Sequence, residues 1–352
     1  MTRFNIAVLD YTRGIAAVAV VLGHARSFVE ETLGYSLFSS SNVWQKILLI
    51  PTIYGVDAVA VFFVLSGFLV GGQALSQSLS NNFRLNLFFA SRLGRLYAVL
   101  FPGLALTALC GVITGTHESL NWWTFFCNLG FAMPVRCGNF GGNSPLWSLG
   151  YEFWFYLLFA GVTGLFVRKS FKSGAILTIA PVLLFGPQLL ILFPAWLLGV
   201  ATAFLDSRLP QLEDKTLKIL VGLAGTCLFV QMCALSWIQA SKTTTILLDA
   251  PMTGLLLFGL VRLTRQSPHR KFRLLDSLAS MSFSLYVVHY PLMQILFANE
   301  VGANLPPLLR IWLFTLIVLP VAHLFYRAFE RHTHILKHRI GRMLGVPSNQ
   351  AT

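Results

Sequence analysis

Apolar runs of about 20 residues, the length that crosses a bilayer, recur along the whole chain and are separated by short polar segments. Eight of them fall at 8–28, 52–74, 87–114, 147–167, 216–237, 244–262, 279–297 and 307–329. A longer run at 174–205 contains Gly186-Pro187, a pair typical of a tight turn, which divides it into two shorter spans. The pattern predicts an all-α, polytopic membrane helix bundle of about ten transmembrane helices.

Two further segments refine this topology. The apolar run 122–133 is too short to cross, so we expect a re-entrant or interfacial piece with Trp122 and Trp123 at headgroup depth. The first span carries ionisable residues and no small-residue cleavage site, so it is expected to be retained. The predicted organisation is a transmembrane domain over 1–335 followed by a basic cytoplasmic tail over 336–352.

Composition and charge agree with a membrane protein. Hydrophobic residues make up 55% of the 352 and charged residues 11%, whereas about 25% is usual in soluble domains. With the N-terminus inside, all but five of the 26 Lys and Arg fall on the inner side, which predicts cytoplasmic termini. The net charge of +13 is then explained by short inner loops facing anionic membrane lipids, and not by nucleic acid. The five outer cations are Arg26, Lys46, Arg136, Lys242 and Arg310.

Arg13 and His24 are the most informative residues, because both lie in the first apolar run. Eleven helical steps bring their side chains to within roughly 20° of one face, about 16 Å apart along the axis. Ionisable groups at such depth usually face a cavity or a partner. The alternative is that Arg13 anchors the helix at the headgroups and that His24 is a hydrogen-bonded packing residue.

Two other segments combine polar residues with apolar helical surroundings. Ser66 and Gly67 are small residues inside the second span, which suits either close helix packing or a catalytic serine. Arg92 and Arg95 share a helix face at the inner end of the third span, which suits a phosphate-bearing ligand or headgroup anchoring.

Glu152 lies about one turn inside the fourth long apolar run, with Trp147 before it as an interfacial anchor. A buried carboxylate needs a partner, and an Arg or His from another span is expected. Late in the chain, His289 is either a second site histidine or a packing residue at a helix break caused by Pro291. At the inner end of the last span, Glu330 is expected in an ion pair.

The cysteines and histidines add little. Cys127 and Cys137 flank one outer loop, and whether they pair stays open because spacing alone does not establish geometry. No metal-ligand spacing is present, so no metal site is predicted.

Taken together, the motifs from Leu9 to Arg331 resemble the membrane acyltransferase 3 family, whose polytopic members move acyl groups, usually acetyl, onto sugars and other extracytoplasmic or lipid-linked acceptors. The family's hallmark, a basic residue followed after ten residues by a histidine, matches Arg13 and His24. One departure is Ala98 after Tyr97, where the family often has proline. The remaining matches are Arg92 and Arg95, then Trp147, Ser148, Leu149 and Glu152, and last Ser282, Tyr286, His289 and Pro291.

The resemblance implies a multi-pass enzyme of the bacterial inner membrane that transfers an acyl group, most simply acetyl, from cytoplasmic acetyl-CoA to a saccharide hydroxyl. His24 would act as base or transient acyl carrier and Glu152 would orient it. Arg13, Arg92 and Arg95 would bind the phosphates of coenzyme A. The supporting residues are Asp10, Ser66, Trp147, Ser148, Tyr156, Tyr286 and His289.

Two alternatives remain at this point. A transporter or flippase of an anionic or lipid-linked substrate also fits many spans with buried charges. An acyltransferase that acts on a small molecule such as an antibiotic would share the mechanism and differ in its acceptor. Assembly as a homo-oligomer is left open by the sequence.

Overall fold

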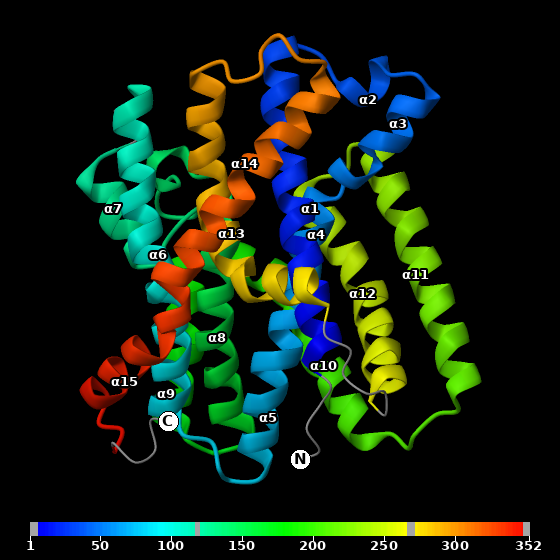
Figure 1. Ribbon diagram of the computed structural model, residues 1–352. Helices are drawn as coiled ribbons and strands as arrows, with labels where there is room; N and C mark the ends of the chain where they lie inside the picture. The colour runs from blue at the N-terminus through cyan, green and yellow to red at the C-terminus, as the bar shows by residue number, and fades with distance from the viewer. Residues whose placement is uncertain (1–5, 117–119, 266–271, 348–352) are drawn as a thin grey trace. The chain divides into compact units, whose positions relative to one another are not determined.

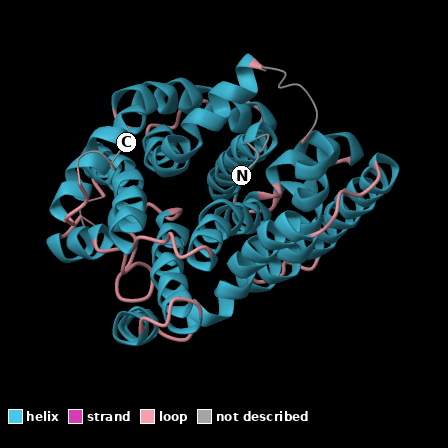
Figure 2. Cartoon of the chain, turned by 90° about the horizontal axis from the view of Figure 1, so that it is seen from below, coloured by secondary structure: helices cyan, strands magenta, loops and turns pink. Residues whose placement is uncertain are grey.

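The computed structural model describes residues 6–116, 120–265 and 272–347, and over these ranges the chain forms helices and no strand (Figure 2). The prediction of an all-α protein is confirmed. Arg3, Arg270 and Lys271, which were counted among the inner cations, lie outside the described residues.

Figure 1 shows the order of the helices along the chain. The longer ones are α1 (Ile6–Leu33), α4 (Gly55–Ser66), α6 (Leu85–Thr114), α8 (Leu146–Phe166), α9 (Phe171–Phe185), α10 (Gln188–Arg208), α11 (Asp214–Trp237), α12 (Lys242–Thr264), α13 (Arg273–Ala298) and α14 (Pro307–Ala328). The shorter ones are α2 (Leu37–Ser40), α3 (Val43–Leu49), α5 (Gly72–Leu79), α7 (Trp122–Leu129) and α15 (Thr333–Met343), and a π-helical segment, Gly67–Gly71, joins α4 to α5.

The helix lengths agree with a multi-pass membrane protein. Nine helical stretches in the described part of the chain are long and apolar enough to cross a membrane. The tenth predicted span is α9, whose 15 residues extend about 22 Å, less than the ~30 Å hydrocarbon core. The predicted turn at Gly186-Pro187 is confirmed, since α9 ends at Phe185 and Gly186 has a positive φ of 84°.

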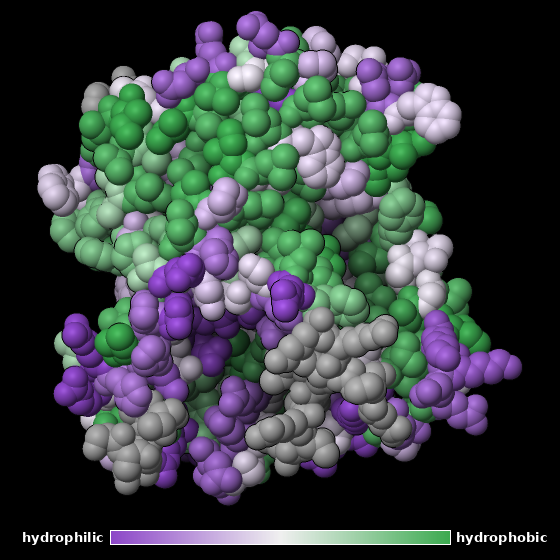
Figure 3. All heavy atoms as spheres, in the orientation of Figure 1, coloured by the Kyte–Doolittle hydropathy of each residue, from purple (hydrophilic) through white to green (hydrophobic). Residues whose placement is uncertain are grey.

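Large apolar side chains reach the surface, as expected where lipid replaces water. They cover much of the face drawn in Figure 3. Examples are Ile113, Leu183 and Phe229, with exposed fractions of 57%, 70% and 49%. Helix α11 is the least enclosed candidate span, with 17% of its most apolar window buried.

The chain folds into two compact units, and α1, α8 and α13 each contribute residues to both. The first unit comprises Met1–Ala16, Tyr54–Asn82 and Glu152–Ser280. The second unit comprises Ala17–Ile53, Phe83–Tyr151 and Met281–Thr352.

In the first unit, glycines bring two helices into backbone contact. Gly67 follows directly after α4, and a Cβ added to it would collide with the backbone carbonyl of Trp196 in α10. Gly199, one turn further along α10, faces the backbone carbonyl of Val64 in the same way. The small residues around Ser66 therefore do allow the close helix approach that their sequence suggested.

In the second unit, the helix break expected at Pro291 is absent, and that prediction is wrong. Helix α13 runs through Pro291 from Arg273 to Ala298. Proline has no N–H for the carbonyl four residues earlier, which is that of Val287. The side-chain amide of Asn143 donates to this carbonyl over 3.1 Å, so the orphaned acceptor is satisfied and the helix continues.

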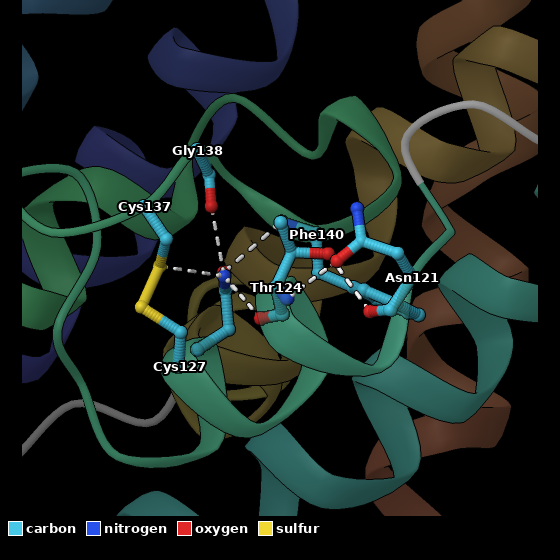
Figure 4. The surroundings of a disulfide bond; sticks show 7 residues. Asn121, Thr124, Cys127, Cys137, Gly138 and Phe140 are labelled. Atoms are coloured by element: carbon cyan, nitrogen blue, oxygen red, sulfur yellow. Dashed lines mark hydrogen bonds between the residues drawn. A yellow bond between two sulfur atoms is a disulfide. The ribbon is translucent and has the colours of Figure 1, made fainter.

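A disulfide between Cys127 and Cys137 closes the loop after α7, which settles the pairing that spacing left open. Buried Asn128 lies beside it and donates to the carbonyls of Thr124 and Gly138 over 2.8 and 2.9 Å (Figure 4). Its Oδ1 accepts from the backbone N–H of Phe140 over 3.1 Å. The expected short helical piece is present as α7, with Trp122 and Trp123 exposed.

Candidate functional site

His24 and His289 come together in the second unit. Their ring centroids lie 5.3 Å apart, with 38° between the ring planes. Tyr290 meets His24 edge-on, with 5.1 Å between centroids. Helix α1 therefore places its histidine against a histidine–tyrosine pair of α13. Whether His289 is a second site histidine or a packing residue stays open.

The hydrogen bond of His289 determines which of its ring nitrogens carries the hydrogen. The side chain is fully buried, and its Nδ1 lies 2.9 Å from the carbonyl oxygen of Leu285. A carbonyl only accepts, so Nδ1 carries the hydrogen and Nε2 of the neutral ring is an acceptor. This Nε2 is buried and has no hydrogen-bond partner among the described residues.

Other sequence-predicted residues join the same unit. Tyr286 donates its hydroxyl hydrogen to the carbonyl of Pro145 over 2.9 Å, and its oxygen lies 2.5 Å from the hydroxyl of Ser148. The ring of Tyr286 lies 6.1 Å from that of His289. Ser148 is thus linked through Tyr286 to His289. Half-buried Trp147 contacts the ring of Tyr151, with 5.8 Å between the ring centroids.

Arg13 lies in the first unit, where its guanidinium forms an ion pair and a hydrogen bond. Nη2 lies 3.0 Å from Asp10 Oδ1 and donates to the carbonyl of Ala279 over 3.0 Å. The side chains of Arg13 and Asp10 remain 20% and 35% exposed. Gly14, next in sequence, packs directly against the backbone at Ala279, which explains how α13 comes so close to this end of α1.

Glu152 belongs to a hydroxyl cluster in the first unit. Ser66 donates to its Oε1 over 2.6 Å, and the hydroxyl of Tyr156 donates to the same oxygen. The indole N–H of Trp196 donates in turn to Ser66 Oγ over 3.2 Å. The prediction of an Arg or His partner for Glu152 is therefore wrong. Among the described residues, the carboxylate accepts hydrogen bonds from the hydroxyls of Ser66 and Tyr156.

Sequence reasoning missed three polar residues of the first unit. Nothing in the sequence marked Trp196 as a hydrogen-bond donor to Ser66, because a tryptophan in an apolar helix is ordinary. The carboxyl groups of Asp57 and Asp249 meet inside the first unit, and Gln231 donates to Asp249 Oδ1 over 2.7 Å. Their signal was available, since each is a carboxylate within an apolar run.

The remaining candidates lie in the second unit. Arg92 and Arg95 are half-buried on α6, and Arg92 donates to Ser91 Oγ over 3.0 Å. Near the end of α14, Glu330 accepts from the backbone N–H and hydroxyl of Ser284 over 2.9 and 2.6 Å. In the part of the chain that the structure describes, no group of three or more His, Cys, Asp or Glu is placed to hold a metal ion.

The site residues thus divide between the units. His24, His289, Tyr286, Ser148, Arg92 and Arg95 belong to the second unit, and Arg13, Asp10, Ser66, Glu152 and Tyr156 to the first. The orientation of His24 by Glu152 stays a prediction.

Comparison with known proteins places the chain in a family. The sequence model of the acyltransferase 3 family, described as an acyltransferase domain, matches residues 6–327. The chain is also 25% identical over 339 residues to the peptidoglycan O-acetyltransferase OatA of Listeria monocytogenes, an alignment that covers 84% of this chain. It covers 50% of OatA, so the chain spans about half the length of this relative. No solved structure matches the chain. The match over residues 6–327 includes His24, Glu152 and His289, and the chain belongs to the acyltransferase 3 family.

Proposed function

We propose that the protein is a membrane O-acyltransferase that moves an acyl group, most simply acetyl, from cytoplasmic acyl-CoA to a hydroxyl of a cell-surface polysaccharide or lipid-linked saccharide. The observation that carries the proposal is the half-buried imidazole of His24 in contact with the rings of His289 and Tyr290. A neutral imidazole in such a place offers one nitrogen to a proton or to a carbonyl carbon.

Two routes use this nitrogen. As a base, His24 takes the proton of the acceptor hydroxyl while that oxygen attacks the thioester carbonyl. The C–S bond breaks, and the thiolate recovers the proton from His24. As a carrier, a nitrogen of His24 attacks the carbonyl carbon, the C–S bond breaks, and the thiolate leaves with the proton that the imidazole loses. The acceptor hydroxyl oxygen then attacks the acyl-imidazole, the C–N bond breaks, and the hydroxyl proton returns the imidazole to its neutral form.

Arg13, Arg92 and Arg95 are proposed to bind the phosphates of the donor. Guanidinium groups suit phosphate through paired, charge-assisted hydrogen bonds. By the distribution of basic residues these arginines lie toward the inner side, where coenzyme A is present. The Asp10 contact and the carbonyl of Ala279 hold the Arg13 guanidinium in place without the full neutralisation that a buried pair would give.

The deciding experiment uses membrane vesicles that contain the protein and acetyl-CoA labelled in its acetyl group. With an acceptor glycan present, alkali-labile label is expected to accumulate on the glycan. Vesicles without the protein are the control. The proposal would be contradicted if the label stayed on coenzyme A with every acceptor. Solute uptake that needs no acyl-CoA would then identify the protein as a transporter.

Removing the charge of Glu152 is expected to impair transfer strongly. Glu152→Gln keeps the size and an acceptor for Ser66 and Tyr156, yet loses the charge, so kcat/KM should fall about a hundredfold or more if the carboxylate acts in proton transfer. Tyr156→Phe removes one hydrogen bond to a charged group and should cost roughly tenfold. Steady-state assays with labelled acetyl-CoA measure both values. Equal activity of Glu152→Gln and wild type would reduce the carboxylate to a packing role.

The proposed orientation places the Cys127–Cys137 loop outside, in a compartment where disulfides persist. In a variant with Cys110, Cys227 and Cys233 changed to serine, a membrane-impermeant maleimide should label intact cells only after reduction by an impermeant reductant. Further change of Cys127 to serine frees Cys137, which should be labelled without reduction. If labelling required permeabilised cells, the Cys127–Cys137 loop would lie on the inner side, opposite to the proposed orientation.

A further inference from the structure

Arg310, near the start of α14 in the second unit, is a buried cation with an exposed fraction of 4%. Its Nε donates to the carbonyl of Val301 over 3.1 Å, and its Nη1 donates to Thr32 Oγ over 3.3 Å. The guanidinium also lies over the ring of Phe314, 5.4 Å from its centroid. These contacts join the start of α14 to the end of α1, and both lie at the top of Figure 1. In the proposed orientation this is the outer end of the unit.

No carboxylate among the residues that the structure describes lies within ion-pair distance of Arg310. Arg262 of the first unit is equally buried, but its Nε lies 3.2 Å from Asp206 Oδ1. Glu31 and Glu300 belong to the segments that Arg310 joins, yet both are exposed and neither forms an ion pair in the described ranges. A buried charge without a counter-ion is costly, so an anion from outside the chain would stabilise Arg310.

One nitrogen of this guanidinium is available to such an anion. Nε and Nη1 make the two hydrogen bonds, whereas Nη2 donates to no group within residues 6–116, 120–265 and 272–347. Nη2 is not sealed inside the protein, so the small exposed part of Arg310 includes this donor. Thr32, which accepts from the neighbouring Nη1, is exposed as well. A guanidinium that is fixed on one side and open on the other is a preorganised donor for an anionic oxygen.

The same face of α1 carries Thr32 and the proposed catalytic histidine. His24, Phe28 and Thr32 follow one another at intervals of four residues, and eight helical steps extend about 12 Å along the axis. The ring of Tyr290 in α13 contacts Phe28 and His24, with 5.0 and 5.1 Å between centroids. This face is therefore turned toward α13 rather than toward lipid, and Arg310 lies at its outer end.

We propose that Arg310 binds an anionic group of the acceptor saccharide, a carboxylate or a phosphate, while the hydroxyl that is acylated lies at His24. The saccharide rests on the proposed function, whereas the anion site rests on the contacts of Arg310. Because about 12 Å along α1 is longer than one sugar ring, the anionic group belongs to a neighbouring sugar or to a phosphate linkage and not to the acylated ring. The phosphate of a lipid headgroup is the competing source of the same charge.

The test is calorimetric titration of the full-length protein in nanodiscs of zwitterionic lipid, with two probes of equal length. One probe is an oligosaccharide that contains glucuronate, and the other is a neutral glucose oligomer. Wild type should bind the acidic probe about tenfold more tightly, because a hydrogen bond between two charged groups is strong. Arg310→Gln should abolish this preference and change the affinity for the neutral probe by less than about twofold. Arg310→Lys keeps the charge and should retain the preference.

The matched control is Lys46→Gln, which removes another outer cation of the same unit and should leave the preference unchanged. Equal binding of the two probes by wild type, or no binding of either, would overturn the proposal. So would an Arg310→Gln variant that keeps the preference and instead loses anionic lipid that co-purifies with wild type, since the site would then belong to a headgroup. If Arg310→Gln does not fold, the wild-type preference decides, and it should shrink as ionic strength rises.

Labelled acetyl-CoA separates this inference from the proposed function. If Arg310→Gln loses the preference while no acceptor receives the label from wild type, the anion site stands and the proposed function fails. If wild type transfers acetyl with the same KM for acidic and neutral acceptors, the proposed function stands and Arg310 has no part in acceptor binding. Both hold if Arg310→Gln raises the KM for the acidic acceptor about tenfold and leaves kcat unchanged.

Discussion

Replacing His24 by alanine is expected to lower acyl transfer by about a hundredfold to ten-thousandfold, the usual contribution of a side chain that moves a proton in the transition state. The same loss or a larger one follows if His24 carries the acyl group, because the carrier nitrogen is then absent. The measurement is mass spectrometry of cell-surface glycans from cells that produce wild type or His24→Ala at equal levels. Acetyl esters should be lost in the variant.

The control for this experiment is His334→Ala. His334 is exposed on α15 and faces the ring of His332 rather than that of His24, so its removal should leave acetylation unchanged. Folding is checked by comparing the elution of the detergent-solubilised variants, since alanine at position 24 removes the ring contacts to His289 and Tyr290. Unchanged acetyl content in every glycan fraction of properly folded His24→Ala would refute its catalytic role.

A companion measurement distinguishes the two routes. When labelled acetyl-CoA is supplied without acceptor, the carrier route predicts label bound to the peptide that contains His24, in an amount that approaches one per protein before hydrolysis. The base route predicts unlabelled protein and intact donor. His289→Gln should weaken either route, because the ring of His289 packs against that of His24.

The sequence predicted the helices well because hydrophobic periodicity and length are local properties. The spans, the turn at Gly186-Pro187 and the short helix at Trp122 all depend on residues close together in the chain. The break at Pro291 failed for a non-local reason, since Asn143 from a distant loop supplies the hydrogen bond that proline cannot.

The candidate site was predictable residue by residue but not pair by pair. Motifs identified His24, Glu152 and His289, yet no spacing indicates that Ser66 would donate to a carboxylate 86 residues away. Such contacts depend on which helix faces meet, and these are decided by packing over whole helices. Hydroxyl partners for Glu152 were overlooked because a charge partner was the stronger expectation for a carboxylate at membrane depth.

Gly67→Ala is expected to destabilise the protein severely, although alanine is the better helix former. The backbone of Gly67 is helical, with φ of −57°, so alanine meets no conformational barrier there. The added methyl group would instead collide with the carbonyl oxygen of Trp196, a backbone atom that moves only if α10 moves. Overpacking of this kind costs about 3 kcal/mol or more, and the unfolding temperature should fall by roughly 5 °C or more.

The matched control is Gly222→Ala on α11, where an added Cβ meets no atom within 4 Å. That variant should unfold at the wild-type temperature or slightly above it, because only the higher helix propensity of alanine remains. Heating the solubilised variants and measuring the monodisperse fraction by size-exclusion chromatography compares them directly. Equal midpoints for Gly67→Ala and Gly222→Ala would contradict the close contact between α4 and α10.

The same substitution also links packing to the proposed chemistry. Ser66 precedes Gly67 and receives the indole N–H of Trp196, the residue whose carbonyl the new methyl group would displace. A shift of α10 therefore pulls the indole from Ser66 and loosens the hydroxyl that holds Glu152. The surviving folded fraction of Gly67→Ala should consequently lose activity in the manner of Ser66→Ala, by roughly tenfold for one hydrogen bond to a charged group. Normal activity per folded molecule would mean that the carboxylate works without this support.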